Sequence, residues 1–382
     1  MSSDWITTTL DRIGKIVTGK TPPTINPEYY GGEVPFITPS DLDGRRIIES
    51  TGRYLTKSGT STVSGAILPP MSVMVSCIGS DMGKAALNAE TAVTNQQINS
   101  IIVNKENDPL FIYYSLLPRK SEIRSAASGS AQPILNKSAF GRMEIILPPR
   151  VKQRAIGKVL GTLDDKIELN RKMNETLEAM ARATFKSWFI DFDEIPADYT
   201  EVKIGDICRL EYGKNLPTTN LIDHGFPVYG AGGVIGYYNK SLYSDPTILI
   251  TCRGNGSGHI HETREEAFVT NNSIAIIPIS AALSRHYVRH SLLSLDRSTV
   301  VTGSAQPQIT VTNLQTLIIR MPKEQKVIQR FHDLVEPLWR RCLENDLETK
   351  VLAKMRDALL PKLIAGEIDV SQVSAVLDEV AI

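Results

Sequence analysis

Residues Gly14–Thr21 have the spacing GxxxxGK[ST] of a phosphate-binding loop. In that motif a glycine-rich loop leads directly into a helix, whose first backbone amides hold phosphate oxygens. Here Pro22 and Pro23 follow, and the segment Pro-Pro-Thr-Ile-Asn-Pro does not predict a helix. We therefore interpret Gly14–Thr21 as a surface loop that carries Lys20, and a nucleotide-binding enzyme is the alternative.

Two groups of residues are of types that bind metal ions. His259 and His261 alternate in a glycine-rich segment, and Asp191, Asp193 and Glu194 follow one another after a predicted helix. Structural zinc sites draw four ligands from closely spaced Cys or His pairs, whereas the four Cys of this chain are scattered without a CxxC. We predict a loop for the His pair, a solvated helix end for the acidic group, and no metal site.

Catalytic motifs are not found in the sequence. Methyl transfer to a base amine needs an Asn/Asp-Pro-Pro-aromatic motif, and none of the pairs that begin at Asn26, Asp108 and Asp245 continues with a second Pro. No Gly-x-Ser-x-Gly elbow occurs either. We predict no catalytic and no cofactor-binding residues in this chain.

Four short motifs occur twice, in the same order and 173 to 176 residues apart. The pairs are Val75–Gly79 with Ile250–Gly254, Thr94–Gln96 with Thr270–Asn272, Gly129–Pro133 with the identical Gly303–Pro307, and Ile145–Pro148 with Ile318–Pro322. Their common offset predicts an internal repeat of two similar domains. The segments between them predict short strands and polar loops, with few helices.

The repeated loops are rich in Asn, Gln, Ser, Thr, Lys and Arg. These side chains can pair with base edges or phosphate oxygens. They also favour turns, which is a sufficient explanation for any single loop. Two matched sets of such loops favour recognition of a ligand with two parts.

Each predicted domain is followed by a long helical segment. Val151–Phe192 has an apolar seam that includes Ile156, Leu160 and Leu163, and about 34 helical residues would span roughly 50 Å. The segment after Pro322 repeats this pattern, with a kink or break expected at Pro337. Two such helices are expected to pack against each other, antiparallel, with the domains at opposite ends.

The charge and hydropathy of the chain bear on whether it binds nucleic acid, crosses a membrane or is secreted. The chain has 42 Lys and Arg against 42 Asp and Glu, so nucleic acid would have to be contacted by local patches. No apolar run is long enough to cross a membrane, and the amino terminus does not predict a secretory signal. Scattered Cys indicate reduced thiols, and we expect a cytoplasmic protein without a membrane partner.

The arrangement of domain, long helix, domain and long helix resembles the specificity subunits of type I restriction–modification enzymes. The likeness covers essentially the whole chain and includes SWFIDF at the end of the first helix and RDALLPKLIAGEI at the end of the second. It implies a mixed α/β fold, with two similar target recognition domains separated by two long antiparallel spacer helices in a pseudo-two-fold repeat. The implied boundaries are 1–150, 151–195, 196–322 and 323–382, for domain, helix, domain and helix with tail.

The resemblance also implies a function and partners. Each domain would recognise one half of a double-stranded DNA target, and the helices would set the spacing and dock two methyltransferase subunits. Restriction subunits with translocase activity would join the complex. S-adenosylmethionine, ATP and magnesium would be bound by these partners. Because the domains differ, for instance PFITPSDLDGRR against FPVYGAGGVIGYY, we expect an asymmetric target. A scaffold that does not bind DNA is a further alternative.

The predicted DNA contacts are polar or aromatic residues of the repeated loops. In the first domain they are Lys20, Thr21, Arg45, Arg46, Ser80, Lys84, Gln96, Gln97 and Gln132. In the second they are Lys214, Asn215, Tyr229, Arg253, Asn255, His259, Asn272 and Gln306. For Gln132 and Gln306 the alternative is a structural role or a contact to the DNA backbone, because an identical repeat does not explain recognition of different bases.

Overall fold

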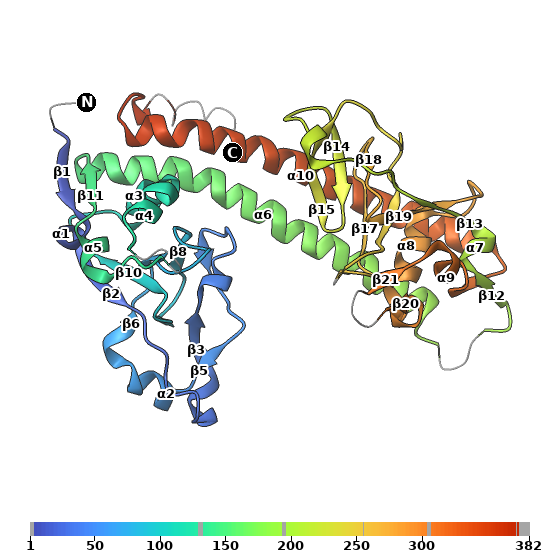
Figure 1. The fold of residues 1–382 in the computed structure, drawn as a ribbon, viewed down its shortest axis with the longest axis horizontal. Helices are drawn as coiled ribbons and strands as arrows, with labels where there is room; N and C mark the ends of the chain where they lie inside the picture. Colours follow the sequence, from blue (N-terminus) through green and yellow to red (C-terminus); the bar gives the residue numbers. More distant parts are fainter. Residues whose placement is uncertain are drawn as a thin grey trace. The chain divides into compact units, whose positions relative to one another are not determined.

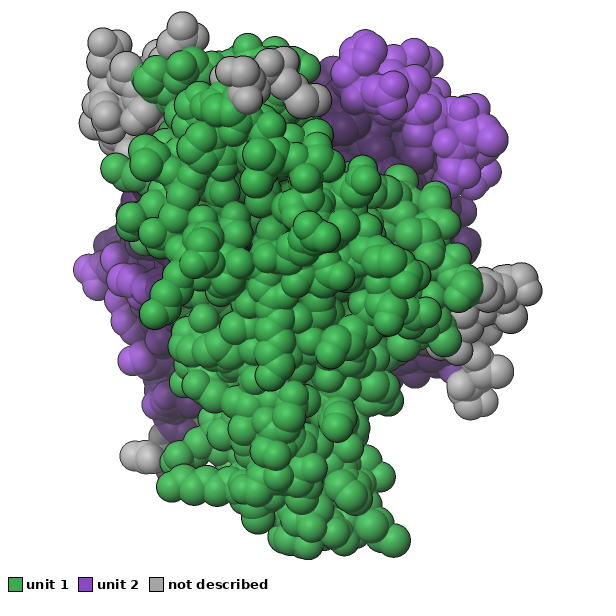
Figure 2. Space-filling model, turned by 90° about the vertical axis from the view of Figure 1, so that its left-hand side faces the viewer, with its two compact units in different colours: residues 1–171, 347–382 green, residues 172–346 purple. Residues whose placement is uncertain are grey.

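The computed structural model describes residues 4–128, 133–192, 196–254, 256–303, 307–371 and 373. The chain divides into two compact units, unit 1 with Met1–Arg171 and Leu347–Ile382, and unit 2 with Lys172–Asp346 (Figure 2). Two 40-residue helices, α6 (Arg150–Phe189) and α10 (Gln325–Ile364), each contribute residues to both units (Figure 1).

Unit 1 contains two main β-sheets. One has the order β2-β10-β7-β8-β4, the other β5-β3-β9-β6, and β1 pairs separately with β11. The strands are β1 (Ile6–Thr9), β2 (Gly14–Thr18), β3 (Tyr30–Ile37), β4 (Ile47–Ile48), β5 (Tyr54–Leu55), β6 (Ile67–Leu68), β7 (Val73–Ser76), β8 (Ala85–Asn88), β9 (Ala92–Thr94), β10 (Ile98–Val103) and β11 (Glu144–Leu147). The short helices are α1 (Leu10–Ile13), α2 (Lys57–Thr62), α3 (Pro109–Leu116), α4 (Lys120–Ser125) and α5 (Lys137–Gly141).

Unit 2 repeats much of this topology. Its central sheet has the order β13-β19-β16-β17, β12 pairs with β22, and a smaller sheet has the order β15-β14-β18. The strands are β12 (Tyr199–Lys203), β13 (Cys208–Tyr212), β14 (Phe226–Gly230), β15 (Gly233–Tyr238), β16 (Ile248–Thr251), β17 (Ile260–Glu262), β18 (Phe268–Val269), β19 (Ser273–Pro278), β20 (Val301–Thr302), β21 (Gln308–Ile309) and β22 (Ile318–Pro322). The short helices are α7 (Ile204–Ile207), α8 (Arg285–Ser294) and α9 (Val311–Leu314).

The two units match strand by strand around their centres. The antiparallel series β2-β10-β7-β8 corresponds to β13-β19-β16-β17, and the terminal pair β1-β11 corresponds to β12-β22. Each unit also has one parallel pair in its second sheet, β3-β9 in unit 1 and β14-β18 in unit 2. The predicted mixed α/β fold with an internal repeat is confirmed.

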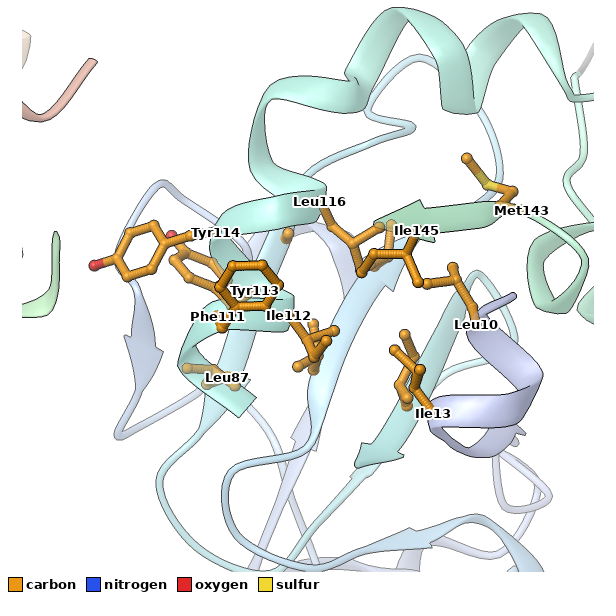
Figure 3. Close-up of a cluster of buried hydrophobic side chains, with 14 of the residues drawn as sticks. Leu10, Ile13, Leu87, Phe111, Ile112, Tyr113, Tyr114, Leu116, Met143 and Ile145 are labelled. Atoms are coloured by element: carbon orange, nitrogen blue, oxygen red, sulfur yellow. The ribbon is translucent and has the colours of Figure 1, made fainter. Parts of the chain in front are cut away.

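A continuous apolar core holds α3 against the central sheet of unit 1. Leu10, Ile13, Phe111 and Ile112 have no more than 1% of their surface exposed, and they belong to one cluster of buried side chains that also includes Leu87 of β8 (Figure 3). Burial of an aliphatic or aromatic side chain of this size contributes about 1.5–3 kcal/mol. Helix α3 starts where it does because the Asp108 carboxylate accepts a hydrogen bond from the Phe111 amide, 3.0 Å away.

The long helices are antiparallel within each unit. In unit 1, Asp164 accepts a hydrogen bond from Arg356 at 2.7 Å, and Asn170 donates one to Glu348 at 2.7 Å. In unit 2, Asn174 donates to Asp346 at 2.8 Å. Residue numbers that rise along α6 therefore meet numbers that fall along α10.

Three details differ from the sequence predictions. Helix α6 begins at Arg150 and ends at Phe189, so it is about six residues longer than the estimate. Helix α10 continues through Pro337 without a break, although proline cannot donate the usual backbone hydrogen bond. The segment Gly14–Thr21, interpreted as a surface loop, contains strand β2 over Gly14–Thr18.

Candidate nucleic-acid interface

In unit 1 the repeated motifs converge at one end of the central sheet. The Lys20 amide donates to the Thr94 carbonyl oxygen at 2.8 Å, and the Cys77 amide donates to the Gln97 carbonyl oxygen at 2.8 Å. The Gly79 amide donates to the Pro133 carbonyl oxygen at 3.3 Å. Motifs that are far apart in the sequence therefore form one continuous group of loops, which we call loop cluster 1.

Unit 2 forms the same group with the same kinds of bond. The Lys214 amide donates to the Val269 carbonyl oxygen at 2.9 Å, and the Cys252 amide donates to the Asn272 carbonyl oxygen at 2.9 Å. The Gly254 amide donates to the Pro307 carbonyl oxygen at 3.1 Å. These loops are loop cluster 2, and the correspondence explains why the motifs recur at one offset.

Glycine allows the closest of these approaches. A Cβ atom on Gly19 would lie 2.1 Å from the Asn95 carbonyl oxygen, and one on Gly213 would lie 2.3 Å from the Thr270 carbonyl oxygen. No side chain fits at such distances from a backbone oxygen. The glycine before Lys20 and Lys214 is therefore required by packing, and this accounts for the Gly-Lys pair without a phosphate loop.

The structure likewise lacks the geometry of a phosphate-binding loop at Gly14–Thr21. Residues Gly14–Thr18 form strand β2, and the next α-helix among the described residues begins only at Lys57. No α-helix begins directly after Thr21 to hold phosphate oxygens, and the next helical element is the three-residue 3-10 turn Pro27–Tyr29.

Four of the nine predicted contacts in unit 1 lie on loop cluster 1. Lys20, Thr21 and Gln96 are exposed, and the Thr21 hydroxyl donates to Gln96 Oε1 at 2.6 Å. Gln97 is half-buried, and its Oε1 accepts a hydrogen bond from the Asn95 amide group. Cluster 1 thus presents two amide side chains beside a lysine and a hydroxyl.

Two further predicted residues lie on the turn that follows β7. Lys84 forms an ion pair with Asp81 at 3.1 Å, and the Ser80 carbonyl oxygen accepts a hydrogen bond from Arg124 at 2.5 Å. The Ser80 residue itself is exposed. The ion pair partly neutralises Lys84 in the absence of a ligand.

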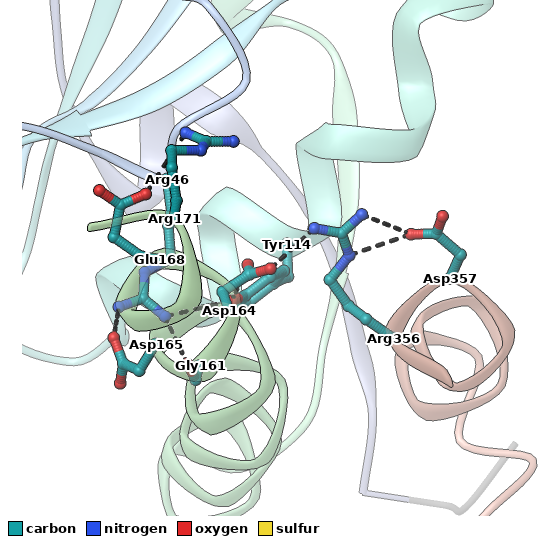
Figure 4. A network of polar contacts seen from close by, with 9 residues as sticks. All are labelled: Arg46, Tyr114, Gly161, Asp164, Asp165, Glu168, Arg171, Arg356 and Asp357. Carbon is teal, nitrogen blue, oxygen red and sulfur yellow. Dashed lines mark hydrogen bonds and ion pairs between the residues drawn. The ribbon is translucent and has the colours of Figure 1, made fainter. Parts of the chain in front are cut away.

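Arg46 lies elsewhere, in a polar network between the β3–β4 segment and α6 (Figure 4). Its Nη1 donates to the Gly161 carbonyl oxygen at 2.7 Å, and its Nη2 forms an ion pair with Asp165. Only 11% of the side chain is exposed. The neighbouring Arg45 pairs with Asp43 at 3.0 Å. The structure gives Arg46 a structural position and does not bring it to loop cluster 1.

In unit 2, Lys214, Asn215, Arg253 and Asn272 are exposed on loop cluster 2. Tyr229 differs, because it is only 7% exposed and its phenolic oxygen accepts the Arg264 amide at 3.2 Å. Tyr229 is therefore a buried core residue and not an exposed residue of loop cluster 2.

His259 is exposed and stacks on His261, with ring centroids 5.5 Å apart. His261 in turn stacks on Tyr229 at 6.4 Å. Burial, together with the nearby His259, lowers the pKa of His261 to about 4, so its ring is neutral near pH 7. The His pair is therefore part of a ring stack at the edge of loop cluster 2.

Gln132, Asn255 and Gln306 lie outside the described residues. Their neighbours Gly254 and Pro307 belong to the hydrogen-bonded framework of cluster 2.

One group of residues has the composition of a metal site. Ligand atoms of His286, His332 and Glu336 lie within 4.8 Å of one another. However, Arg285 and Arg340 each form an ion pair with Glu336, at 2.9 and 2.8 Å. Two guanidinium charges on one carboxylate oppose the approach of a divalent cation. We interpret this group as an ion-pair cluster that joins α8 to α10.

Two similar domains with matched polar loops, and paired long helices in each unit, define a class of modular recognition proteins. A model of the family described as type I restriction modification DNA specificity domain matches residues 2–179 and 196–336. The chain belongs to this family, and the resemblance inferred from its sequence is confirmed. It is a specificity subunit, the non-catalytic DNA-recognition component of a type I system, and such subunits bind DNA and work with methylase and restriction subunits.

Individual relatives agree with this assignment. The chain is 29% identical over 413 residues to the type I restriction enzyme MjaIX specificity subunit of Methanocaldococcus jannaschii, covering 97% of this chain and 94% of the relative. It is 34% identical over 179 residues to the HindI specificity subunit of Haemophilus influenzae, covering 45% and 39%. The solved S subunit from M. genitalium has the same fold, with a TM-score of 0.63, 20% identity, and coverage of 94% and 96%. None of the described helices has an apolar stretch long enough to cross a bilayer.

Proposed function

We propose that unit 1 and unit 2 each contact one part of a two-part DNA target, through loop clusters 1 and 2. The observation that supports this most strongly is the matched set of backbone hydrogen bonds, which assembles the same loops in both units. On this common framework the exposed side chains differ. By the matched bonds, Gln97 in cluster 1 corresponds to Asn272 in cluster 2, and Ile78 corresponds to Arg253. A shared framework with different side chains suits recognition of two different base sequences.

The long helices are proposed to set the distance between the two parts of the target. Forty residues of α-helix span about 60 Å at ~1.5 Å per residue. Half-sites one DNA turn apart are separated by about 34 Å, which helices of this length can span. The same helices are proposed to dock two methyltransferase subunits.

The partners are proposed to carry the chemistry and the cofactors. S-adenosylmethionine, ATP and magnesium would be bound by methyltransferase and restriction subunits. With 42 basic and 42 acidic residues, the chain alone should bind DNA weakly, because affinity for DNA depends strongly on neutralised phosphates. A cytoplasmic location agrees with four free Cys, all of them buried.

The proposal is tested by exchanging residues 1–150 for the corresponding domain of a relative, in cells that carry the complete system. Sequencing of methylated adenines should then show one half of the target replaced and the other half retained. The reciprocal exchange of residues 196–322 should replace the other half. If either exchange left both halves unchanged, or altered both, the assignment of one unit to each half would be wrong.

A further inference from the structure

The β14–β15 hairpin of unit 2 carries two exposed aliphatic side chains next to loop cluster 2. Val234 is 50% exposed and Ile235 is 46% exposed. Neighbouring residues of a regular strand point to opposite faces, so one of the two would ordinarily face inward. We propose that Val234 and Ile235 form an apolar contact with a thymine methyl group in the half-site that unit 2 recognises. This rests on the proposed function.

The hairpin is distorted where these residues lie. Val228 pairs with Gly236 and Tyr229 pairs with Val234, so Ile235 is the extra residue of a β-bulge. A bulge breaks the alternation of side chains and redirects them. Ile235 also packs over Gly230, where its Cγ2 lies 2.9 Å from the position that a Cβ would occupy. The backbone and a glycine therefore hold Ile235 in place.

The tip of the hairpin is bonded to loop cluster 2. The Thr251 hydroxyl donates to the Ala231 carbonyl oxygen, and the Ser273 hydroxyl donates to the Gly230 carbonyl oxygen at 3.3 Å. Thr251 directly precedes the Cys252 loop, and Ser273 directly follows Asn272. A ligand that reaches Arg253 and Asn272 thus lies close to the aliphatic pair.

Unit 1 differs at the equivalent position. The Ile37 carbonyl oxygen accepts the Asn95 amide at 3.0 Å, and the Tyr229 carbonyl oxygen accepts the Thr270 amide at 2.9 Å, so β3 and β14 end at matching places. After β3 comes a polar turn in which the Thr38 hydroxyl donates to Asp41 at 2.7 Å. After β14 comes the aliphatic hairpin. The two units therefore differ in the segment next to their shared loop framework. Residues that determine which bases are recognised are expected at such a position.

Thymine is the occupant that this chemistry favours. In the major groove of DNA only thymine presents a methyl group among the four common bases, and aliphatic side chains recognise it by apolar contact. A β-ribbon fits the major groove, which is about 12 Å wide. The polar residues of cluster 2 would position the hairpin by contacts to phosphate and to neighbouring base edges.

The test uses the complete methyltransferase complex and duplexes that contain its methylation target. Each thymine of the half-site assigned to unit 2 is replaced singly by deoxyuridine, which removes only the methyl group. Loss of one buried methyl contact should weaken wild-type binding about fourfold at one position. In the Val234→Ala/Ile235→Ala variant, which should itself bind the thymine target about fourfold less tightly, the same replacement should have no effect.

Ile279→Ala is the matched control, because Ile279 is also in unit 2 and is 65% exposed. It should leave both binding and the deoxyuridine effect unchanged. A half-site without thymine, or equal deoxyuridine effects in the wild-type and the double variant, would refute the hairpin contact. The domain exchange described above tests separately whether unit 2 recognises a half-site. If the domain exchange replaced one half of the target, but the deoxyuridine effect were the same in the wild type and the double variant, only the hairpin proposal would be rejected.

Discussion

The polar residues predicted to contact DNA have two different roles in the structure. Some hold the loops in place, and others are exposed on the loops, where a ligand could reach them. Arg46 illustrates the first role, because three of its contacts are to α6 or α3: the Gly161 carbonyl oxygen, Asp165 and the Tyr114 hydroxyl. Lys20 and Lys214 illustrate the second, because only their backbone amides belong to the framework and both residues are exposed. Sequence type alone does not separate these roles.

Replacement of Arg46 by Ala should destabilise unit 1 by about 2 kcal/mol, because the hydrogen bonds of a largely buried charged group are lost. Arg45→Ala should cost only about 0.5 kcal/mol, since the Arg45 side chain is more exposed than that of Arg46 and forms its ion pair with Asp43 at the surface. Chemical denaturation of the full chain, followed by hydrogen exchange in unit 1 peptides, measures both changes. Equal effects of the two substitutions would mean that Arg46 does not anchor the β3–β4 segment.

Lys20→Ala and Lys214→Ala should each weaken DNA binding by the assembled complex on all sequences alike. If each lysine neutralises one phosphate, the slope of log affinity against log salt should fall by about 1 for each substitution. The methylated sequence should stay the same. Lys57→Ala, at the start of α2 and outside loop cluster 1, is the control. A changed target sequence would instead place these lysines on base edges.

At the scale of elements, the packing of α3 against α6 depends on glycine. A Cβ on Gly157 would lie 2.9 Å from Asp108 Oδ1 and 2.9 Å from the Leu110 Cβ. Asp108 is the residue that caps α3. The close approach of the two helices therefore fixes the N-terminus of α3 on the surface of α6.

Gly157→Ala should destabilise unit 1 by about 1–3 kcal/mol through overpacking, although Ala favours a helix by about 1 kcal/mol. Gly161→Ala should cost less, because its Cβ would meet the end of the Arg46 side chain at 3.1 Å and Leu110 Cδ1 at an ordinary contact distance of 3.9 Å. Thermal denaturation of the two variants compares them directly. If Gly157→Ala instead raised the melting temperature, the contact between position 157 and α3 would have to adjust without a cost in stability.

At the scale of the whole molecule, the two units differ in their histidines. All six His lie between residues 172 and 346, so unit 2 contains every one and unit 1 contains none. His286 and His290 are 1% and 4% exposed. Burial, reinforced by nearby cationic groups, lowers the pKa of His286 to about 4 and that of His290 to about 3. For His286, the hydrogen bond to Glu336 partly opposes this effect.

Unit 2 should therefore lose stability in mild acid before unit 1 does. Because the folded-state pKa values lie below the ordinary 6.5, the stabilisation is complete above pH 6.5 and is lost as the pH falls toward 4. Each buried imidazole contributes at most about 1.4 kcal/mol per pH unit in this window. Hydrogen exchange between pH 7 and pH 4.5, corrected for intrinsic rates, should show protection lost first in residues 172–346. His290→Leu should reduce the difference, and equal loss in both units would contradict this account.

The repeat, the long helices and the mixed α/β class could all be predicted from the sequence. These depend on local signals: apolar spacing along a helix, turn residues, and motifs that recur at one offset. At Pro337 the break that was one of the two predicted outcomes does not occur, because α10 is a single helix from Gln325 to Ile364. The exposed aliphatic pair could have been noticed in GAGGVIGYY, where glycines flank two apolar residues.

Which polar residues come together could not be predicted, because it depends on contacts between distant segments of the folded chain. Arg46 and Lys20 are equally plausible ligands by type, but long-range contacts bury one and expose the other. Tyr229 is likewise a polar aromatic in a predicted loop, and its pairing with β18 places it in the core. The bulge that exposes Ile235 arises from the register between two strands, which no single segment encodes. Burial and strand register are properties of contacts between distant segments. For that reason the residue types of the two loop clusters could be predicted from the sequence, whereas their arrangement in space required the folded structure.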